Sequence, residues 1–70
     1  MWKYAGELRV GDVWTERTRR RDTRSYRVIA MARGPAPATI TVTGSCVTTS
    51  QQRTMDFFLF NRVEVHEEQT

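Results

Sequence analysis

The strongest constraint on the fold is a strict alternation of apolar and polar residues in short segments. Residues 39–43 (TITVT) alternate without exception and are β-branched throughout, and residues 62–66 (RVEVH) alternate in the same way. Successive side chains of a β-strand point to opposite faces, so this pattern predicts strands with one buried face. No segment keeps the 3.6-residue period of an amphipathic helix for long. The sequence therefore predicts an all-β chain with little or no helix.

Two further segments predict a β-hairpin in the first half of the chain. Residues 13–18 (VWTERT) and 25–32 (SYRVIAMA) favour strands by composition, and the second is the more apolar. The residues that join them, 20–23 (RRDT), are polar, as is typical of a turn. Gly11 and Asp12 form a tight-turn dipeptide that we expect to reverse the chain just before the first strand.

The remaining segments are less uniform. Residues 34–37 (GPAP) predict a loop, because each proline removes an amide donor. Residues 44–53 are polar and predict either a long loop or a frayed hairpin. Residues 55–60 (MDFFLF) predict a strand that is apolar on both faces, and the alternative is one helical turn capped by Asp56.

About five short strands in 70 residues is the density of a small barrel or a rolled antiparallel sheet. We expect one domain over residues 1–70, because a chain of this length has room for one core. Residues 8–14 (LRVGDVW) resemble the opening of many small SH3-like β-barrels, including nucleic-acid-binding and phage- or actinobacterial-type proteins. The resemblance implies an SH3-like barrel. It implies no functional residues, because such barrels host many unrelated functions.

The positive charge of the chain is concentrated in the predicted hairpin. Residues 16–27 hold six arginines against two carboxylates, a local net charge of +4, whereas the whole chain carries +3. Guanidinium groups are permanently charged and bind phosphate in a bidentate fashion. A hairpin that points most of these groups outward together would therefore bind nucleic acid. The six residues are Arg17, Arg19, Arg20, Arg21, Arg24 and Arg27.

Each part of this interpretation has an alternative. The arginines would also serve to keep an exposed hairpin soluble and to discourage pairing of its edges. Trp14 and Tyr26 would supply stacking surfaces for unpaired bases. Their alternative role is in the core of a chain that has little apolar bulk.

A second candidate surface is aromatic. Trp2 and Tyr4 lie near the amino end, and Phe58 and Phe60 belong to the segment that is apolar on both faces. Unless the chain covers them, these rings predict a partner surface or a dimer seam. A homodimer is expected on size as well, since few cores of this length suffice alone.

Catalysis has no support in the residue types present. The chain holds one histidine, His66, and one cysteine, Cys46, and its four glycines are scattered singly. These counts exclude a zinc site made by this chain alone and a glycine-rich phosphate loop. We expect no enzymatic activity, metal or cofactor. Cys46 is expected in a polar loop, with no cationic neighbour visible in sequence to lower the pKa of its thiol.

The expected role is that of a non-catalytic binding module in the cytoplasm. A single unpaired thiol suits a reducing compartment, and no segment approaches the ~20 apolar residues needed to cross a bilayer. DNA or RNA is the first expected partner. The alternatives are an adaptor or inhibitor, such as a phage protein that docks on an acidic surface of a host protein, and a structural subunit of an assembly.

Overall fold

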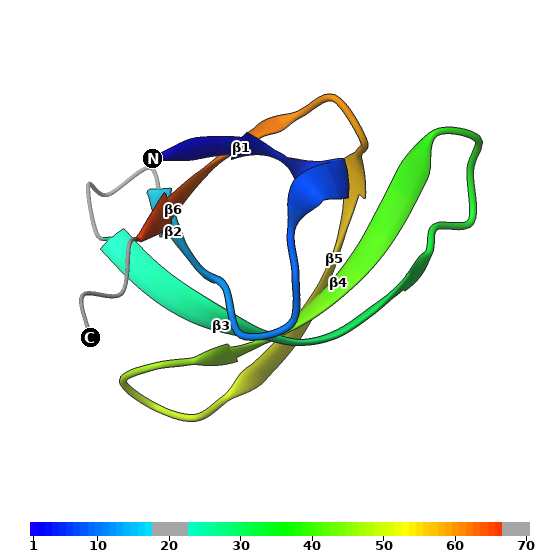
Figure 1. The fold of residues 1–70 in the computed structure, drawn as a ribbon. Coiled ribbons are helices and arrows are strands. Elements are labelled where there is room, and N and C mark those ends of the chain that lie inside the picture. The colour runs from blue at the N-terminus through cyan, green and yellow to red at the C-terminus, as the bar shows by residue number, and fades with distance from the viewer. Residues whose placement is uncertain (18–22, 67–70) are drawn as a thin grey trace.

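The fold is taken from a computed structural model that describes residues 1–17 and 23–66. Six strands in this part of the chain form one antiparallel sheet in the order β1-β6-β2-β3-β4-β5 (Figure 1). The all-β prediction is confirmed, with six strands in place of about five. The elements are β1 (Trp2–Tyr4), the 3-10 helix η1 (Ala5–Glu7), β2 (Val13–Arg17), β3 (Thr23–Arg33), β4 (Thr39–Cys46), β5 (Gln52–Phe58) and β6 (Arg62–His66).

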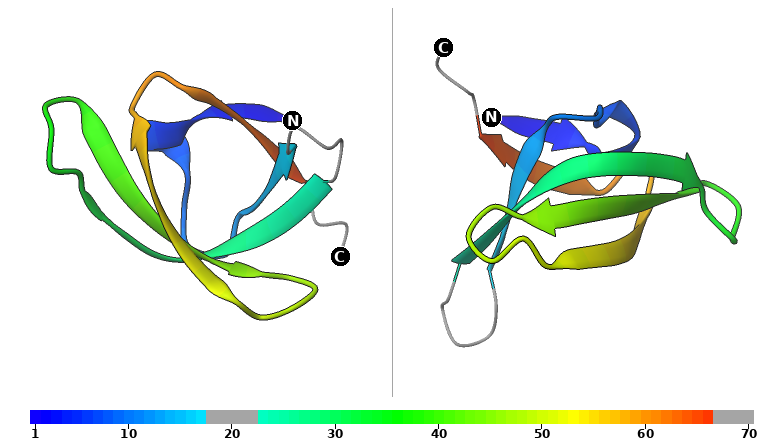
Figure 2. Two further views of the ribbon diagram at one scale, coloured as in Figure 1. Left: turned by 180° about the vertical axis from the view of Figure 1, so that it is seen from behind. Right: turned by 90° about the horizontal axis from the view of Figure 1, so that it is seen from below.

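The sheet curls on itself because its longest strand bends. β3 is 11 residues long, and its register with β4 shifts between Val28 and Ala30. A β-bulge of this kind bends a strand and increases its twist. The sheet consequently wraps round a single core, and η1 with the loop after it lies across one side of the curl (Figures 1 and 2).

The core follows directly from the alternation in the sequence. Val42 in β4 and Val63 and Val65 in β6 are buried, as the period-two pattern predicts. η1 and its following loop add Ala5 and Leu8 to the same cluster. The other buried members of the core cluster are Trp14, Tyr26, Val28 and Cys46.

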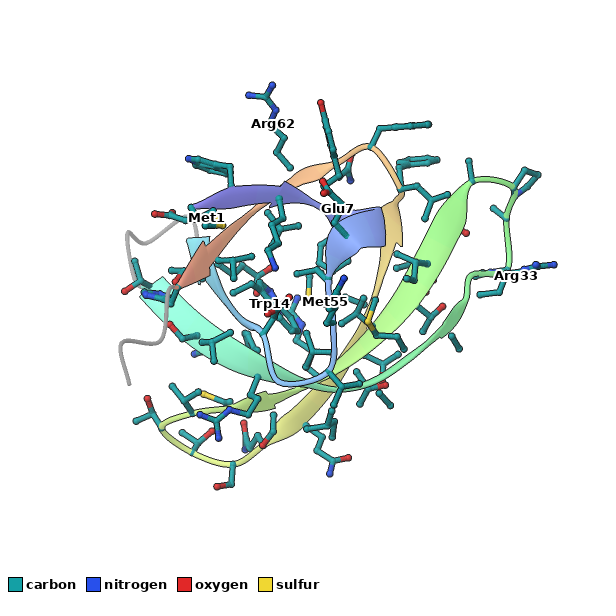
Figure 3. The ribbon with its side chains drawn as sticks, in the orientation of Figure 1. Met1, Glu7, Trp14, Arg33, Met55 and Arg62 are labelled. Carbon is teal, nitrogen blue, oxygen red and sulfur yellow. The ribbon has the colours of Figure 1, made fainter. Side chains whose placement is uncertain are left out.

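Trp14 is the largest buried side chain and lies at the centre of this core (Figure 3). Its ring stacks on Tyr26, with centroids 5.3 Å apart, and meets the edge of Phe57 at 6.3 Å. The indole also lies against Gly44 of β4, where a Cβ atom would fall 2.3 Å from the Trp14 Cη2 atom. Among the described residues its Nε1–H has no hydrogen-bond partner, so packing alone holds the indole in place.

The turns agree largely with the sequence. Gly11 has a φ of +100°, and the Asp12 amide donates to the Arg9 carbonyl at 3.0 Å, so the predicted turn is confirmed. The Gly34 amide closes the proline-containing loop by donating to the Thr39 carbonyl at 3.0 Å.

Two segments differ from expectation or resolve an alternative. β4 and β5 form a continuous hairpin, so of the two alternatives for residues 44–53, a long loop or a hairpin, the structure shows the hairpin. β5 ends at Phe58, two residues earlier than the predicted strand, because the Asn61 amide bonds the Phe58 carbonyl at 3.0 Å and closes a turn. The helical alternative at Asp56 is wrong, since that residue lies within β5. Within residues 1–17 and 23–66, no helix is long and apolar enough to cross a membrane.

The contact between Trp14 and Gly44 gives a direct test of the core. We expect Gly44→Ala to lower the free energy of unfolding by about 1–3 kcal/mol, because the new methyl group would overlap the buried Trp14 ring. Ser45→Ala, one position along β4, is the control and should change it by about 0.5 kcal/mol or less. Urea denaturation of both variants measures the difference, and equal stabilities would contradict this packing.

Candidate nucleic-acid interface

The predicted hairpin is present as the β2–β3 ribbon. Its pairing runs from Val13 opposite Arg27 to Arg17 opposite Thr23 without a break. Arg19, Arg20 and Arg21 lie outside the described residues, as does the side chain of Arg17. The structure therefore places two of the six predicted arginine side chains, Arg24 and Arg27.

These two side chains are exposed but lie on opposite faces of the ribbon. Arg24 pairs with Glu16 on the face that carries Tyr26, whereas Arg27 pairs with Val13 on the other face. The reason is their odd spacing along the strand, since residues three apart alternate in direction. Arg24 and Arg27 therefore do not share a face, and the expectation that most of the six guanidinium groups point outward together stays a prediction, because the other four side chains lie outside the described residues.

A third arginine, Arg53 of β5, joins Arg24 on the inner face. Its Nη1 donates to the Glu16 Oε2 at 2.7 Å, so it bridges β5 to β2 at the end of the core. A hydrogen bond with Tyr26, and then the charge of Glu16, raise the pKa of Arg53. Sequence reasoning missed this residue, because its place beside the ribbon depends on the β4–β5 register, which puts Arg53 opposite Gly44.

Arg24 and Arg53 line a polar pocket of about 530 Å³ between the ribbon and the β4–β5 turn. Every described residue that lines it is neutral or basic. Besides the two guanidinium groups, the lining consists of Thr23, Tyr26, Cys46, Thr48, Thr49, Gln51 and Gln52. Such a lining offers many hydrogen-bond donors and suits an anion.

Cys46 lies at the inner wall of this pocket. The sequence placed it in a polar loop, but it is the last residue of β4 and its side chain is buried. A hydrogen bond from the Thr49 hydroxyl, followed by the amides of Thr48 and Thr49, lowers the pKa of the thiol against the opposing effect of burial. Arg24 lowers the pKa further, so a cationic neighbour exists that the sequence did not show.

Trp14 and Tyr26 are placed in the core. They are 2% and 3% exposed and stack on each other. In this arrangement neither ring presents an open face to a base, so the alternative of a core role is the one that the structure shows.

The aromatic candidates, in contrast, are exposed. Trp2 and Tyr4 of β1 are 63% and 44% exposed, and Phe58 and Phe60 are 61% and 77% exposed. The Ala5 amide donates to the Asn61 carbonyl at 2.8 Å, which holds the β5–β6 turn beside β1. Figure 3 shows the side chain of Arg62, which pairs with Tyr4, pointing away from the sheet on this side. The four rings thus belong to neighbouring elements.

Comparison with known proteins adds no assignment. No protein-family model matches the chain, and neither a curated protein nor a solved structure shows significant similarity to it.

The environment of Cys46 can be tested by titration. We expect Thr49→Val to raise the pKa of the thiol, because the Thr49 hydroxyl is the strongest of the groups that lower it. Thr48→Val is the matched control and should leave the pKa unchanged, since Thr48 acts through its backbone amide. The ¹³Cβ chemical shift of Cys46 measured against pH reports both values. Equal thiol pKa values in the two variants would show that the Thr49 hydroxyl does not contact the sulfur.

The lowered pKa also gives stability a pH dependence. Because the pKa of the Cys46 thiol is lower in the folded state than in the unfolded state, ionisation of the thiol stabilises the fold. This stabilisation is fully present above the thiol pKa of the unfolded chain and is lost as the pH falls through the lowered pKa of the folded state.

Proposed function

We propose that the protein is a nucleic-acid-binding module without catalytic activity, built on an SH3-like scaffold and acting in the cytoplasm. DNA or RNA contacts the arginines of the β2–β3 ribbon, which include Arg19, Arg20 and Arg21 at its connecting segment. The observation that carries the proposal is the local net charge of +4 on residues 16–27, joined in space by Arg53 from β5.

The physical basis of binding is the exchange of counterions for arginine side chains. Each guanidinium that neutralises a phosphate releases a condensed cation, so affinity falls steeply with salt. A two-stranded ribbon is also narrow enough to enter the major groove of duplex DNA. Because Arg24 and Arg27 lie on different faces, their contacts are more consistent with phosphate binding than with a single row of base contacts.

Charge reversal at the connecting segment tests the proposal. We expect the triple variant Arg19→Glu, Arg20→Glu and Arg21→Glu to abolish binding of a fluorescent oligonucleotide in anisotropy titrations at low salt. The control variant carries Arg9→Glu, Arg33→Glu and Arg62→Glu, three exposed arginines outside the stretch in which β2 pairs with β3, and it changes the net charge equally. It should keep most of the affinity. Equal losses in the two variants would show that net charge, and not the ribbon, governs binding.

The exposed aromatic residues favour a second function, protein–protein interaction. Four large aromatic rings on neighbouring elements are 44–77% exposed. Exposed apolar side chains gathered in this way are typical of a surface that binds another protein. This surface would serve an adaptor, an inhibitor of a partner protein or a subunit of an assembly, and a second copy of the chain is its simplest occupant.

Self-association provides the test of the aromatic surface. We expect the wild type to form a homodimer in sedimentation equilibrium, and the double variant Phe58→Ser and Phe60→Ser to remain a monomer. Both rings are exposed, so the variant should fold with nearly unchanged stability. A wild type that stays monomeric at millimolar concentration would contradict the dimer, and a variant that still dimerises would move the interface elsewhere.

A further inference from the structure

We propose that the pocket between the ribbon and the β4–β5 turn is a phosphate-binding subsite, in which one phosphodiester group of a nucleic acid lies between Arg24 and Arg53. The inference rests on the proposed function and deepens it, because it names the chemical group that the inner face of the ribbon recognises. It also assigns a role to Arg53, which lies far from the arginine-rich segment in sequence.

The topology of the sheet brings the two guanidinium groups to one concave surface. Arg24 extends from β3 and Arg53 from β5, and β4 runs between these two strands. Arg53 pairs with Gly44, whose missing side chain leaves room for the Trp14 indole, so the pocket begins where the aromatic core ends. The pocket therefore has charged groups on two sides and the buried Tyr26 and Cys46 in its lining.

The charge of the pocket selects an anion. No carboxylate is among the described residues that line it. Glu16 engages the Nη1 of Arg53 from outside the pocket, and Tyr26 in the lining also hydrogen-bonds Arg53, but a guanidinium has five N–H donors in all, so others remain for a ligand. The hydroxyls of Thr23, Thr48 and Thr49 also line it. A phosphodiester offers oxygen acceptors to both kinds of donor.

The surroundings of the Cys46 thiol agree with this geometry. Its thiol pKa is lowered by the hydroxyl of Thr49, by two amides of the β4–β5 turn and by Arg24, so the site already stabilises an anion. A bound phosphate would repel the thiolate and offset part of this effect. By linkage, phosphate binding must raise the pKa of Cys46, and thiolate formation must weaken phosphate binding by the same factor.

This linkage makes Cys46 a reporter that does not depend on oligonucleotide binding. The experiment follows the ¹³Cβ chemical shift of Cys46 against pH, with and without a saturating dinucleoside monophosphate, and with inorganic phosphate in a parallel arm. We expect the dinucleotide to raise the pKa of the thiol in the wild type. Arg53→Gln should abolish the rise, because it removes a phosphate ligand that does not itself set the thiol pKa.

The control is Arg33→Gln, which should leave the rise intact. Arg33 is exposed and lies at the other end of β3, next to the β3–β4 turn (Figure 3). Arg53→Lys separates charge from geometry, since lysine keeps the charge but loses the bidentate fork, and we expect it to retain part of the rise. Thermal unfolding of each variant checks that the pocket is still folded.

Anisotropy titrations with an oligonucleotide distinguish failure of the inference from failure of the proposed function. If the subsite is real, Arg53→Gln reduces the slope of log affinity against log salt by about one unit. If the wild type binds the oligonucleotide while Arg53→Gln changes neither this slope nor the thiol titration, the inference is overturned and the proposed function stands. If inorganic phosphate raises the thiol pKa and no oligonucleotide binds, the phosphodiester is overturned as the ligand, together with the proposed function.

Discussion

The packing of Trp14 against Gly44 is the contact on which the rest of the structure depends. A single sheet without a covering helix layer can bury a core only by curling on itself, and a curl needs bulk at its centre. Trp14 supplies that bulk from β2 and reaches across to β4, where the missing side chain of Gly44 leaves room for the indole. Tyr26 and Phe57 complete the aromatic centre from β3 and β5. One ring thus connects four strands.

The position of this aromatic centre also determines where the charged surface begins. The β2–β3 ribbon continues past the pair formed by Trp14 and Tyr26, and the next inward-facing pair is Glu16 and Arg24. There the core ends, so inward-facing side chains can be polar and remain hydrated. Arg53 and Glu16 connect the two sides of the curl at this point with a hydrogen bond of 2.7 Å. The polar pocket therefore lies directly beyond the end of the core, on the same inner face of the sheet.

Much of the fold could be predicted from the sequence, because local alternation determines which face of a strand is buried. Residues 39–43 and 62–66 behave as their pattern indicates, and the turn at Gly11 needs the positive φ that glycine permits. β1 was missed, because its three residues are too few to show a period and it is defined by pairing with β6. Strand ends were less predictable for the same reason, since pairing rather than composition decides them.

The candidate site was less predictable than the fold, because its parts are distant in sequence. The cluster of arginines between residues 16 and 27 is visible in the sequence, but the direction of each side chain depends on the register of β2 with β3. Arg53 and the thiol of Cys46 enter the site through the β4–β5 hairpin, which polar composition left open as a loop or a hairpin. If the β4–β5 register could be read from the sequence, the position of Arg53 beside the ribbon would have been predictable as well.

The most direct test of a ribbon-centred interface is to map which backbone amides respond to an oligonucleotide, using ¹H–¹⁵N correlation spectra of the protein at low salt. We predict that the shifts concentrate on residues 16–27 and on the β4–β5 turn with Arg53, and that they disappear as salt is added. The account would be contradicted by shifts confined to β1 and the β5–β6 turn around Phe60, or by spectra that do not change at all.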